Sequence, residues 1–305
     1  MELVIFDLEW NSGYCKKTGK FINEIIELGA VKLNEQMEQI GQFSIFVRPE
    51  ITRRPNPKVR ELTQLTNEDL IHGATFSYAI SKFRKFTSGC VISSWSTSDL
   101  SSLEANCEYY NRSPKIPFLE RYADVQEYCQ DMIGSVKNQL ALQGAAELLG
   151  IDSDDIPLHR AVGDSILTAR ILRKLYDPEK FASYVKTVDD EFYARLNFKT
   201  TFIYDINNPL INRDELFMLC GECGTRCEAS DGWKSRNKAF YADLICPSCG
   251  KKTRGRIQFK LCYDGLTVIK RTIAEPSEKT DEKAEDPDTD TEEMGYQACL
   301  NASDR

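Results

Sequence analysis

Hydrophobic residues fall into short, regularly spaced runs over the first 176 residues of this chain. Residues 3–9 are apolar and β-branched and predict a buried strand, and residues 25–33 and 41–47 predict two more strands after short gaps. An Arg-Pro pair ends the third run, and a loop rich in proline and arginine follows it. This spacing indicates a three-stranded meander.

The next 130 residues alternate between helical and strand-like patterns. The expected elements are a turn or short helix at 67–70, a helix at 78–86, a strand at 90–95, a helix at 100–110, a short strand at 121–125, and helices at 139–149 and 162–176. Strands that alternate with helices after a meander predict an α/β fold. We therefore expect a mixed sheet of five strands flanked by helices in a first domain, residues 1–176.

The rest of the chain divides by charge. Residues 177–215 read as a helical or irregular connector. Residues 216–270 carry ten Lys or Arg against five Asp or Glu, whereas residues 271–305 carry eleven acids against four bases. The net charge of −8 therefore hides a basic module followed by an acidic tail, which its composition predicts to be disordered.

Overall composition is that of a globular protein, with 41% apolar and 28% charged residues. The chain opens directly into an apparent strand, without a leader pattern or an apolar run near roughly 18 residues. We expect a cytoplasmic protein that makes no contact with a membrane. The same features argue against a disulfide scaffold for its eleven cysteines.

Two acids interrupt the first apolar strand, at Asp7 and Glu9. Alternation along a strand places both on one face. Acids are poor strand formers, and burying two of them is costly unless a positive charge compensates. Bound metal ions would do so. The alternative, an edge strand with a solvated face, is disfavoured by the apolar residues 3–6.

Three further polar residues follow in an order that suggests metal-dependent chemistry: Asp99, His159 and Asp164. Asp99 taken alone also fits a helix N-cap, and Asp164 fits a first-turn acid favoured by the helix dipole. Carboxylates suit Mg²⁺ and Mn²⁺, and two such ions can clamp both reacting oxygens of a phosphodiester. His159 can accept a proton near neutral pH, whereas His72 reads as a surface turn residue.

Together these motifs resemble those of DEDDh 3′–5′ exonucleases, the DnaQ-like group of the RNase H-like superfamily. Asp7 and Glu9 match its first motif, Asp99 its second, and His159, Ala161 and Asp164 the third, His-x-Ala-x-x-Asp. The stretches NEIIELGAVKL and QLALQGAAELLGI also match, so the resemblance covers residues 2–176. Its motifs resemble those of the subgroup that contains histone-mRNA 3′ exonucleases and KapD-like bacterial proteins. Asn11 replaces a frequent Thr, and Gly163 a frequent Asp.

The resemblance implies an RNase H-like fold and a 3′–5′ exonuclease. It implies that Asp7, Glu9, Asp99 and Asp164 hold two Mg²⁺ or Mn²⁺ ions and that His159 is the general base. Single-stranded RNA or DNA is then the expected partner. Trp10 and Trp95 lie near the metal acids in sequence, where they would either stack on a terminal base or pack in the core.

Two CxxCG turns separated by 22 residues stand in the basic module, at 220–224 and 246–250. Such turns aim pairs of thiolates at one point, so Cys220, Cys223, Cys246 and Cys249 predict one structural Zn²⁺ in a zinc ribbon. Cys227 is a spare candidate. Residues available to bind nucleic acid are Lys251, Lys252, Arg254 and Arg256, with Trp233, Phe240 and Tyr241 as stacking groups.

Competing functions stay open at this level. A solvated surface, or a protein partner for the ribbon or the acidic tail, would explain the same charges. A protein that keeps the nuclease fold but only binds nucleic acid or protein is the alternative function, and the complete acidic set disfavours it. An endonuclease on the same general fold is a third. The sequence does not decide between RNA and DNA, and it does not give the biological target, processivity or oligomeric state.

Overall fold

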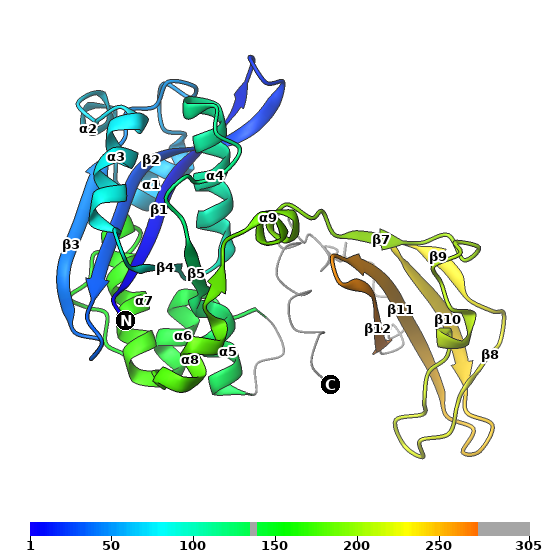
Figure 1. Ribbon diagram of the computed structural model, residues 1–305. Helices are drawn as coiled ribbons and strands as arrows, with labels where there is room; N and C mark the ends of the chain where they lie inside the picture. The colour runs from blue at the N-terminus through cyan, green and yellow to red at the C-terminus, as the bar shows by residue number, and fades with distance from the viewer. Residues whose placement is uncertain (135–138, 274–305) are drawn as a thin grey trace. The chain divides into compact units, whose positions relative to one another are not determined.

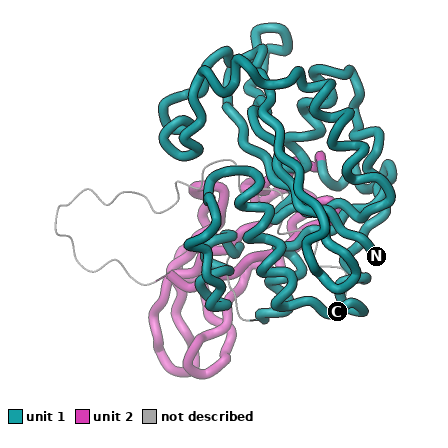
Figure 2. The backbone as a smooth tube through the Cα atoms, turned by 90° about the vertical axis from the view of Figure 1, so that its left-hand side faces the viewer, with its two compact units in different colours: residues 1–196 teal, residues 197–305 magenta. Residues whose placement is uncertain are grey.

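A computed structural model of the chain describes residues 1–134 and 139–273, which Figure 1 draws in colour. The chain divides into two compact units, Met1–Leu196 and Asn197–Arg305, which Figure 2 separates by colour. The boundary lies inside the range 177–215 that we expected to be a connector.

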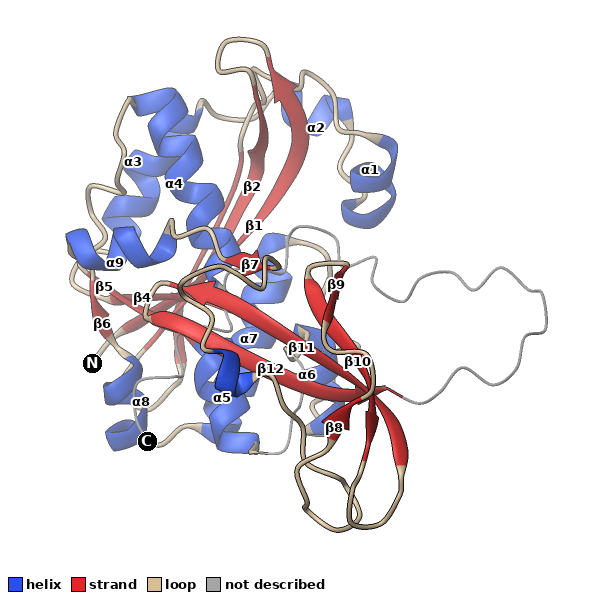
Figure 3. Ribbon diagram, turned by 90° about the vertical axis from the view of Figure 1, so that its right-hand side faces the viewer, coloured by secondary structure: helices blue, strands red, loops and turns tan. Residues whose placement is uncertain are grey.

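The first unit is a mixed sheet with helices on both faces (Figures 1 and 3). Its strands are β1 (Leu3–Cys15), β2 (Lys20–Leu33), β3 (Gln39–Phe46), β4 (Val91–Ser94), β5 (Arg121–Asp124) and β6 (Lys186–Thr187). Its helices are α1 (Pro57–Thr63), α2 (Asn67–Ile71), α3 (Phe76–Phe86), α4 (Thr97–Asn111), α5 (Val125–Ile133), α6 (Leu142–Leu148), α7 (Ala161–Leu175), α8 (Pro178–Tyr184) and α9 (Asp190–Leu196).

Strand β1 lies inside the sheet, whose order is β3-β2-β1-β4-β5-β6. It pairs antiparallel with β2 and parallel with β4. The expected mixed sheet is confirmed, and β6 adds a sixth strand of two residues at its edge. The predicted connector supplies that strand, because the chain runs back along β5 after α8.

Both faces of β1 are covered, which explains its continuous apolar run. Its even-numbered residues 4–8 belong to the core that includes α3 and α4. Residues 3 and 5 belong to the other core, which includes α5 and α7. Asp7 and Glu9 continue the second series, so they lie on the α7 side of the sheet.

Helix α7 approaches β2 unusually closely at Gly29. A β-carbon on Gly29 would lie 2.1 Å from the backbone nitrogen of Val162 and 2.3 Å from the carbonyl carbon of Ala161. Only glycine permits this separation. The first turn of α7, which carries Asp164, is therefore pressed against the strand next to β1.

Several elements differ from expectation. Strands β1 and β2 run on into a long hairpin whose turn lies between Cys15 and Lys20. Helix α1 begins at the end of the predicted loop, where Asn56 accepts a bond from the Val59 N–H and Pro57 starts the helix. Helix α5 follows β5 directly and was not expected.

The second unit is a sheet of antiparallel strands with a small core of its own. Its elements are β7 (Thr201–Ile203), the 3₁₀ turn η1 (Arg213–Glu215), β8 (Glu228–Ala229), β9 (Lys234–Arg236), β10 (Ala239–Ile245), β11 (Lys252–Cys262) and β12 (Gly265–Ile273). The path is β12-β11-β10-β8, with β7 beside β11 and β9 beside β10. Phe240, Ile257 and Phe259 are fully buried in its core.

The expected disordered tail begins too early, because residues 271–273 pair with β11 as the end of β12. Residues 274–305, the rest of that prediction, lie outside the described residues. Among residues 1–134 and 139–273, no helix has both the length and the apolar character needed to cross a membrane.

Candidate active site and metal-binding clusters

Three of the acids singled out in the sequence meet at one point. Asp7 and Glu9 come from β1, and Asp164 comes from the first turn of α7. One carboxylate oxygen from each lies within 4.8 Å of the others. The close approach of α7 at Gly29 brings Asp164 to the strand. Residues separated by more than 150 positions thus form one oxygen cluster.

The fourth acid, Asp99, lies beside this cluster in the first turn of α4 and is 5% exposed. The Leu8 N–H donates to its Oδ1 at 3.2 Å, which holds the carboxylate against β1 next to Asp7. Ser96, and not Asp99, is the N-cap of α4. The helix-cap explanation of Asp99 is therefore wrong for this chain.

Crowding of these carboxylates makes their negative charge costly. Burial raises the pKa of Glu9 to about 8, and repulsion from Asp164, Glu27 and Asp99 adds to the effect. Burial likewise raises the pKa of Asp99 to about 7, although the bond from Leu8 opposes it. The pKa of Asp7 rises well above its usual range through burial and through repulsion from Asp99 and Asp164.

Such a cluster fits a divalent metal. Its donors are carboxylate oxygens, which hard cations prefer, and three of them are close enough to share an ion. A cation would also relieve the repulsion that raises these pKa values. Asp7, Glu9 and Asp164, with Asp99 beside them, are therefore the residues that could hold such an ion.

His159 lies in the bend just before α7, outside that oxygen cluster, and is half-buried. Its φ of 58° is left-handed, which is uncommon for residues other than glycine. Burial raises the pKa of Asp164, and the charge and backbone of His159 lower it, so the two groups are neighbours. The other histidine, His72, is exposed at the end of α2.

Sequence reasoning missed two residues at this site, Glu27 and Arg160. Glu27 is fully buried on β2 opposite Glu9. Arg160 binds it through two hydrogen bonds of 3.0 Å, and its charge also lowers the pKa of Glu9. A Glu inside an apolar strand was the available signal, because a buried carboxylate requires a partner.

The two departures from the family pattern have structural explanations. Asn11 is buried, donates to the Arg54 carbonyl at 2.8 Å and accepts from the Asn56 N–H at 2.9 Å. A β-carbon on Gly163 would lie 2.0 Å from the Pro157 carbonyl oxygen, so a larger residue has no room.

The two tryptophans are placed differently. Trp95 is 8% exposed within the core shared with α5 and α7, and its indole N–H donates to the Leu140 carbonyl at 3.2 Å. It is thus used in packing. Trp10 is half-buried and packs against the core beneath α3 and α4.

The predicted cysteines form a second cluster. One sulfur from each of Cys220, Cys223, Cys246 and Cys249 lies within 4.8 Å of the others. Three sulfur pairs are 3.4–3.7 Å apart. A tetrahedral zinc site with Zn–S bonds of 2.3 Å requires sulfurs about 3.8 Å apart. These residues therefore fit zinc, and Cys227 lies outside the cluster.

Both cysteine turns share one backbone geometry. The glycine N–H of each donates to the first cysteine's carbonyl at 2.9 Å, from Gly224 to Cys220 and from Gly250 to Cys246. Gly224 and Gly250 have φ values of 70° and 72°, a conformation that favours glycine.

Three of the four ribbon cations already have partners. They are Lys251 with Glu222, Arg254 with Asp243 at 3.7 Å, and Arg256, whose Nε–H donates to the Tyr241 hydroxyl at 3.1 Å. Lys252 is exposed at the start of β11. Phe240 is fully buried and cannot stack on a base, so that part of the expectation is wrong.

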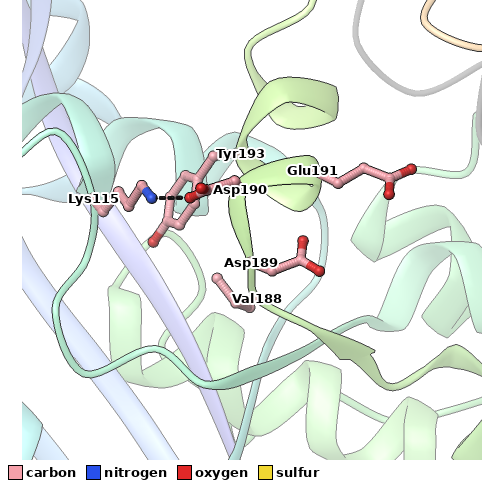
Figure 4. A pocket seen from close by; sticks show the side chains of 6 residues that line it. All are labelled: Lys115, Val188, Asp189, Asp190, Glu191 and Tyr193. Atoms are coloured by element: carbon pink, nitrogen blue, oxygen red, sulfur yellow. Dashed lines mark hydrogen bonds and ion pairs between the residues drawn. The ribbon is translucent and has the colours of Figure 1, made fainter.

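A shallow cavity of about 440 Å³ lies elsewhere on the first unit (Figure 4). Its lining comprises Lys115, Val188, Asp189, Asp190, Glu191 and Tyr193. None of the carboxylates described above lines it. Lys115 is paired with Asp190 within this lining.

Comparisons with known proteins agree with this geometry. A family model described as Exonuclease (RNase_T) matches residues 4–172. Solved structures with a similar fold include a full-length 3′-exonuclease, with a TM-score of 0.52 and 24% identity, covering 62% of this chain and 91% of that one. Another is the nuclease domain of 3′hExo, described as a DEDDh family member bound to rAMP, with a TM-score of 0.52 and 22% identity, covering 62% and 96%. No curated protein matches the chain.

Proposed function

Because this chain belongs to the exonuclease family and is a hydrolytic exonuclease, we propose that it shortens single-stranded RNA or DNA from the 3′ end. The observation that carries the proposal is the convergence of Asp7, Glu9 and Asp164 within 4.8 Å, with Asp99 held beside them. The His-x-Ala-x-x-Asp motif supports 3′–5′ exonuclease action over internal cleavage.

We propose that Asp7, Glu9, Asp99 and Asp164 hold two Mg²⁺ or Mn²⁺ ions. When bound, these ions supply positive charge to the attacking and leaving oxygens of the phosphodiester. All four acids are held by regular elements, since two lie on β1, one in the first turn of α4 and one in the first turn of α7.

His159 is the proposed general base. Its imidazole accepts the proton of the attacking water through a ring nitrogen, and its left-handed backbone places it at the entrance to α7. Arg160, the residue that follows His159, is tied to β2 by its two hydrogen bonds to Glu27.

The zinc ribbon is proposed as a separate structural site with one Zn²⁺ held by four cysteines. Thiolates favour zinc, whereas carboxylates favour Mg²⁺ or Mn²⁺. Its basic residues 251–256 are proposed to contact long nucleic acid strands. Lys252 supports this most directly because it is exposed, whereas its three neighbours would have to exchange or share partners.

The test follows single-stranded RNA and DNA of the same sequence, labelled at the 5′ end, with Mg²⁺, Mn²⁺ or a chelator. The expected result is labelled products that shorten one nucleotide at a time, only when metal is present. Asp164→Asn should abolish cleavage with an unchanged fold, whereas Asp154→Asn, an exposed acid ten residues earlier, should not. Labelled products cut at interior positions without the stepwise ladder, or shortening in chelator, would contradict the proposal. Binding without cleavage under every condition would favour the adaptor function.

A further inference from the structure

A basic surface continues beyond the acidic cluster along the same strand. The loop and helix start at residues 48–60, here called the basic loop, contain five Arg or Lys and one acid, Glu50. Arg53, Arg54, Lys58 and Arg60 are all exposed. Within residues 1–134 and 139–273, no acid forms an ion pair with any of these four side chains.

The basic loop is anchored on the face of β1 that bears the acids. Asn11, two residues and about 7 Å past Glu9, bonds to the Arg54 carbonyl and the Asn56 N–H. Further along, a β-carbon on Gly13 would lie 2.5 Å from the Thr52 side chain, so the loop lies directly on the strand. The exposed arginines therefore begin where the acidic cluster ends.

A buried carboxylate holds the loop in place. Glu24 is fully buried and accepts bonds from the backbone N–H groups of Glu50, Ile51 and Thr52 at 2.6–2.8 Å. It also accepts from the Thr52 hydroxyl and from Tyr110. An arginine-rich loop would ordinarily be mobile, but these bonds fix its backbone. Preorganised charges lose less entropy when they bind a ligand.

The hairpin turn extends the same basic character. Lys16, Lys17 and Lys20 are exposed at the tip of the β1–β2 hairpin, which projects from the sheet in Figures 1 and 3. Residues 12–20 contain no acid. The hairpin and the basic loop touch through Gly13 and Thr52, so their charges belong to one surface.

We infer that the basic loop, continued by the hairpin tip, binds the phosphate backbone of the strand whose 3′ end lies at the acidic cluster. The inference rests on the proposed function. The ligand of this surface is a polyanion. Cations without acidic partners neutralise successive phosphates of such a strand whatever its base sequence. An acidic cluster alone repels such a strand, and the neighbouring cations offset that repulsion.

The test compares Arg53→Gln/Arg54→Gln with Arg84→Gln/Lys85→Gln. The control pair is also exposed and lies on α3, on the opposite side of the sheet from α7. Two substrates are used: a single strand of about 20 nucleotides, longer than typical binding sites, and the p-nitrophenyl ester of thymidine 5′-monophosphate. The ester reaches only the acidic cluster.

In the loop variant, KM for the strand should rise on the order of tenfold with kcat unchanged. The slope of log KM against log salt concentration should decrease by roughly 1.4, because two cations are removed. Kinetics of the ester should not change, and the control variant should match wild type. Anisotropy of the labelled strand in chelator gives a readout independent of cleavage, with affinity expected to fall by a similar factor.

Unchanged strand affinity and salt slope in the loop variant would overturn the inference and leave the surface to a protein partner. Equal losses in both variants would also overturn it, because net charge alone would then explain them. A wild-type protein inactive on both substrates refutes the proposed function instead, and anisotropy still decides whether the basic loop binds the strand.

Discussion

At the scale of single residues, His159 combines a proposed chemical role with an unusual backbone. Asparagine tolerates the left-handed conformation but cannot act as a base near neutral pH. His159→Asn should therefore keep the loop and lose about 10²–10⁴-fold in kcat. Steady-state cleavage of a labelled strand measures this, and His72→Asn is the matched control. A variant that cleaves at wild-type rate would remove His159 from the reaction.

The carboxylate cluster also predicts how protons and metal compete. The folded-state pKa of Glu9 is about 8 and that of Asp99 about 7, both above their usual values of 4.5 and 3.8. Between about pH 4 and pH 8 the folded chain therefore binds more protons than the unfolded chain. The free energy of unfolding of the metal-free protein should fall as pH rises through this range, from about 4 to 8. Glu9→Gln should weaken that fall.

Binding of Mg²⁺ near pH 6 should then release about two protons per chain from Glu9 and Asp99, and more if Asp7 is also protonated. Calorimetry in two buffers of different ionisation enthalpy measures this number, using protein that retains its zinc. If no protons are released, or if wild type and Glu9→Gln show the same pH dependence of unfolding, the acids are not protonated as inferred.

At the scale of elements, Glu24 of β2 joins the basic loop to β2 and, through Tyr110, to α4. Glu24→Ala leaves three backbone N–H groups without their charged acceptor, so the free energy of unfolding should fall by about 2–5 kcal/mol. Hydrogen exchange at residues 50–52 should accelerate. Glu38→Ala, at an exposed position where the carboxylate takes one bond from Asn34, should cost less than about 0.5 kcal/mol. Equal effects of the two changes would mean that Glu24 does not anchor the loop.

Elements with a long, regularly repeating run of hydrophobic residues could be predicted from the sequence. The strands β1, β2 and β3 and the helix α7 appear in the expected places because their apolar faces meet a core. Helix α1 was missed because it buries only Thr63 and lies among prolines and arginines. Helix α5 was missed because it starts directly after β5, with no turn residue to mark the change.

The acids of the site were visible as a motif, but their surroundings were not. Glu27 lies opposite Glu9 only because of the β1–β2 register, which shifts by one residue immediately beyond that pair. Arg160 meets Glu27 across 133 positions of sequence. Such pairings depend on tertiary structure, and a single sequence does not specify the register of two strands in this detail.

At the scale of the whole molecule, the two units should use different metals: cleavage by the first unit should require Mg²⁺ or Mn²⁺, and folding of the second should require zinc. Removing zinc should unfold the second unit, because the four sulfurs would lose the ion that joins both turns. Scanning calorimetry should show two transitions, of which a zinc chelator shifts only one. Cys220→Ser should act like the chelator, whereas Cys227→Ser, outside the cluster, should retain one zinc per chain. A single transition unaffected by chelation would contradict a structural zinc site.

The contact at Gly29 has a consequence for how this protein tolerates change. The missing side chain sets the distance between α7 and the sheet, and hence between Asp164 and the acids of β1. In a saturation library sorted for nuclease activity, position 29 should accept no substitute, not even alanine. Many positions with large side chains should be more permissive. Gly29 would then be the least replaceable residue outside the reacting groups, although it has no side chain and makes no contact with the substrate.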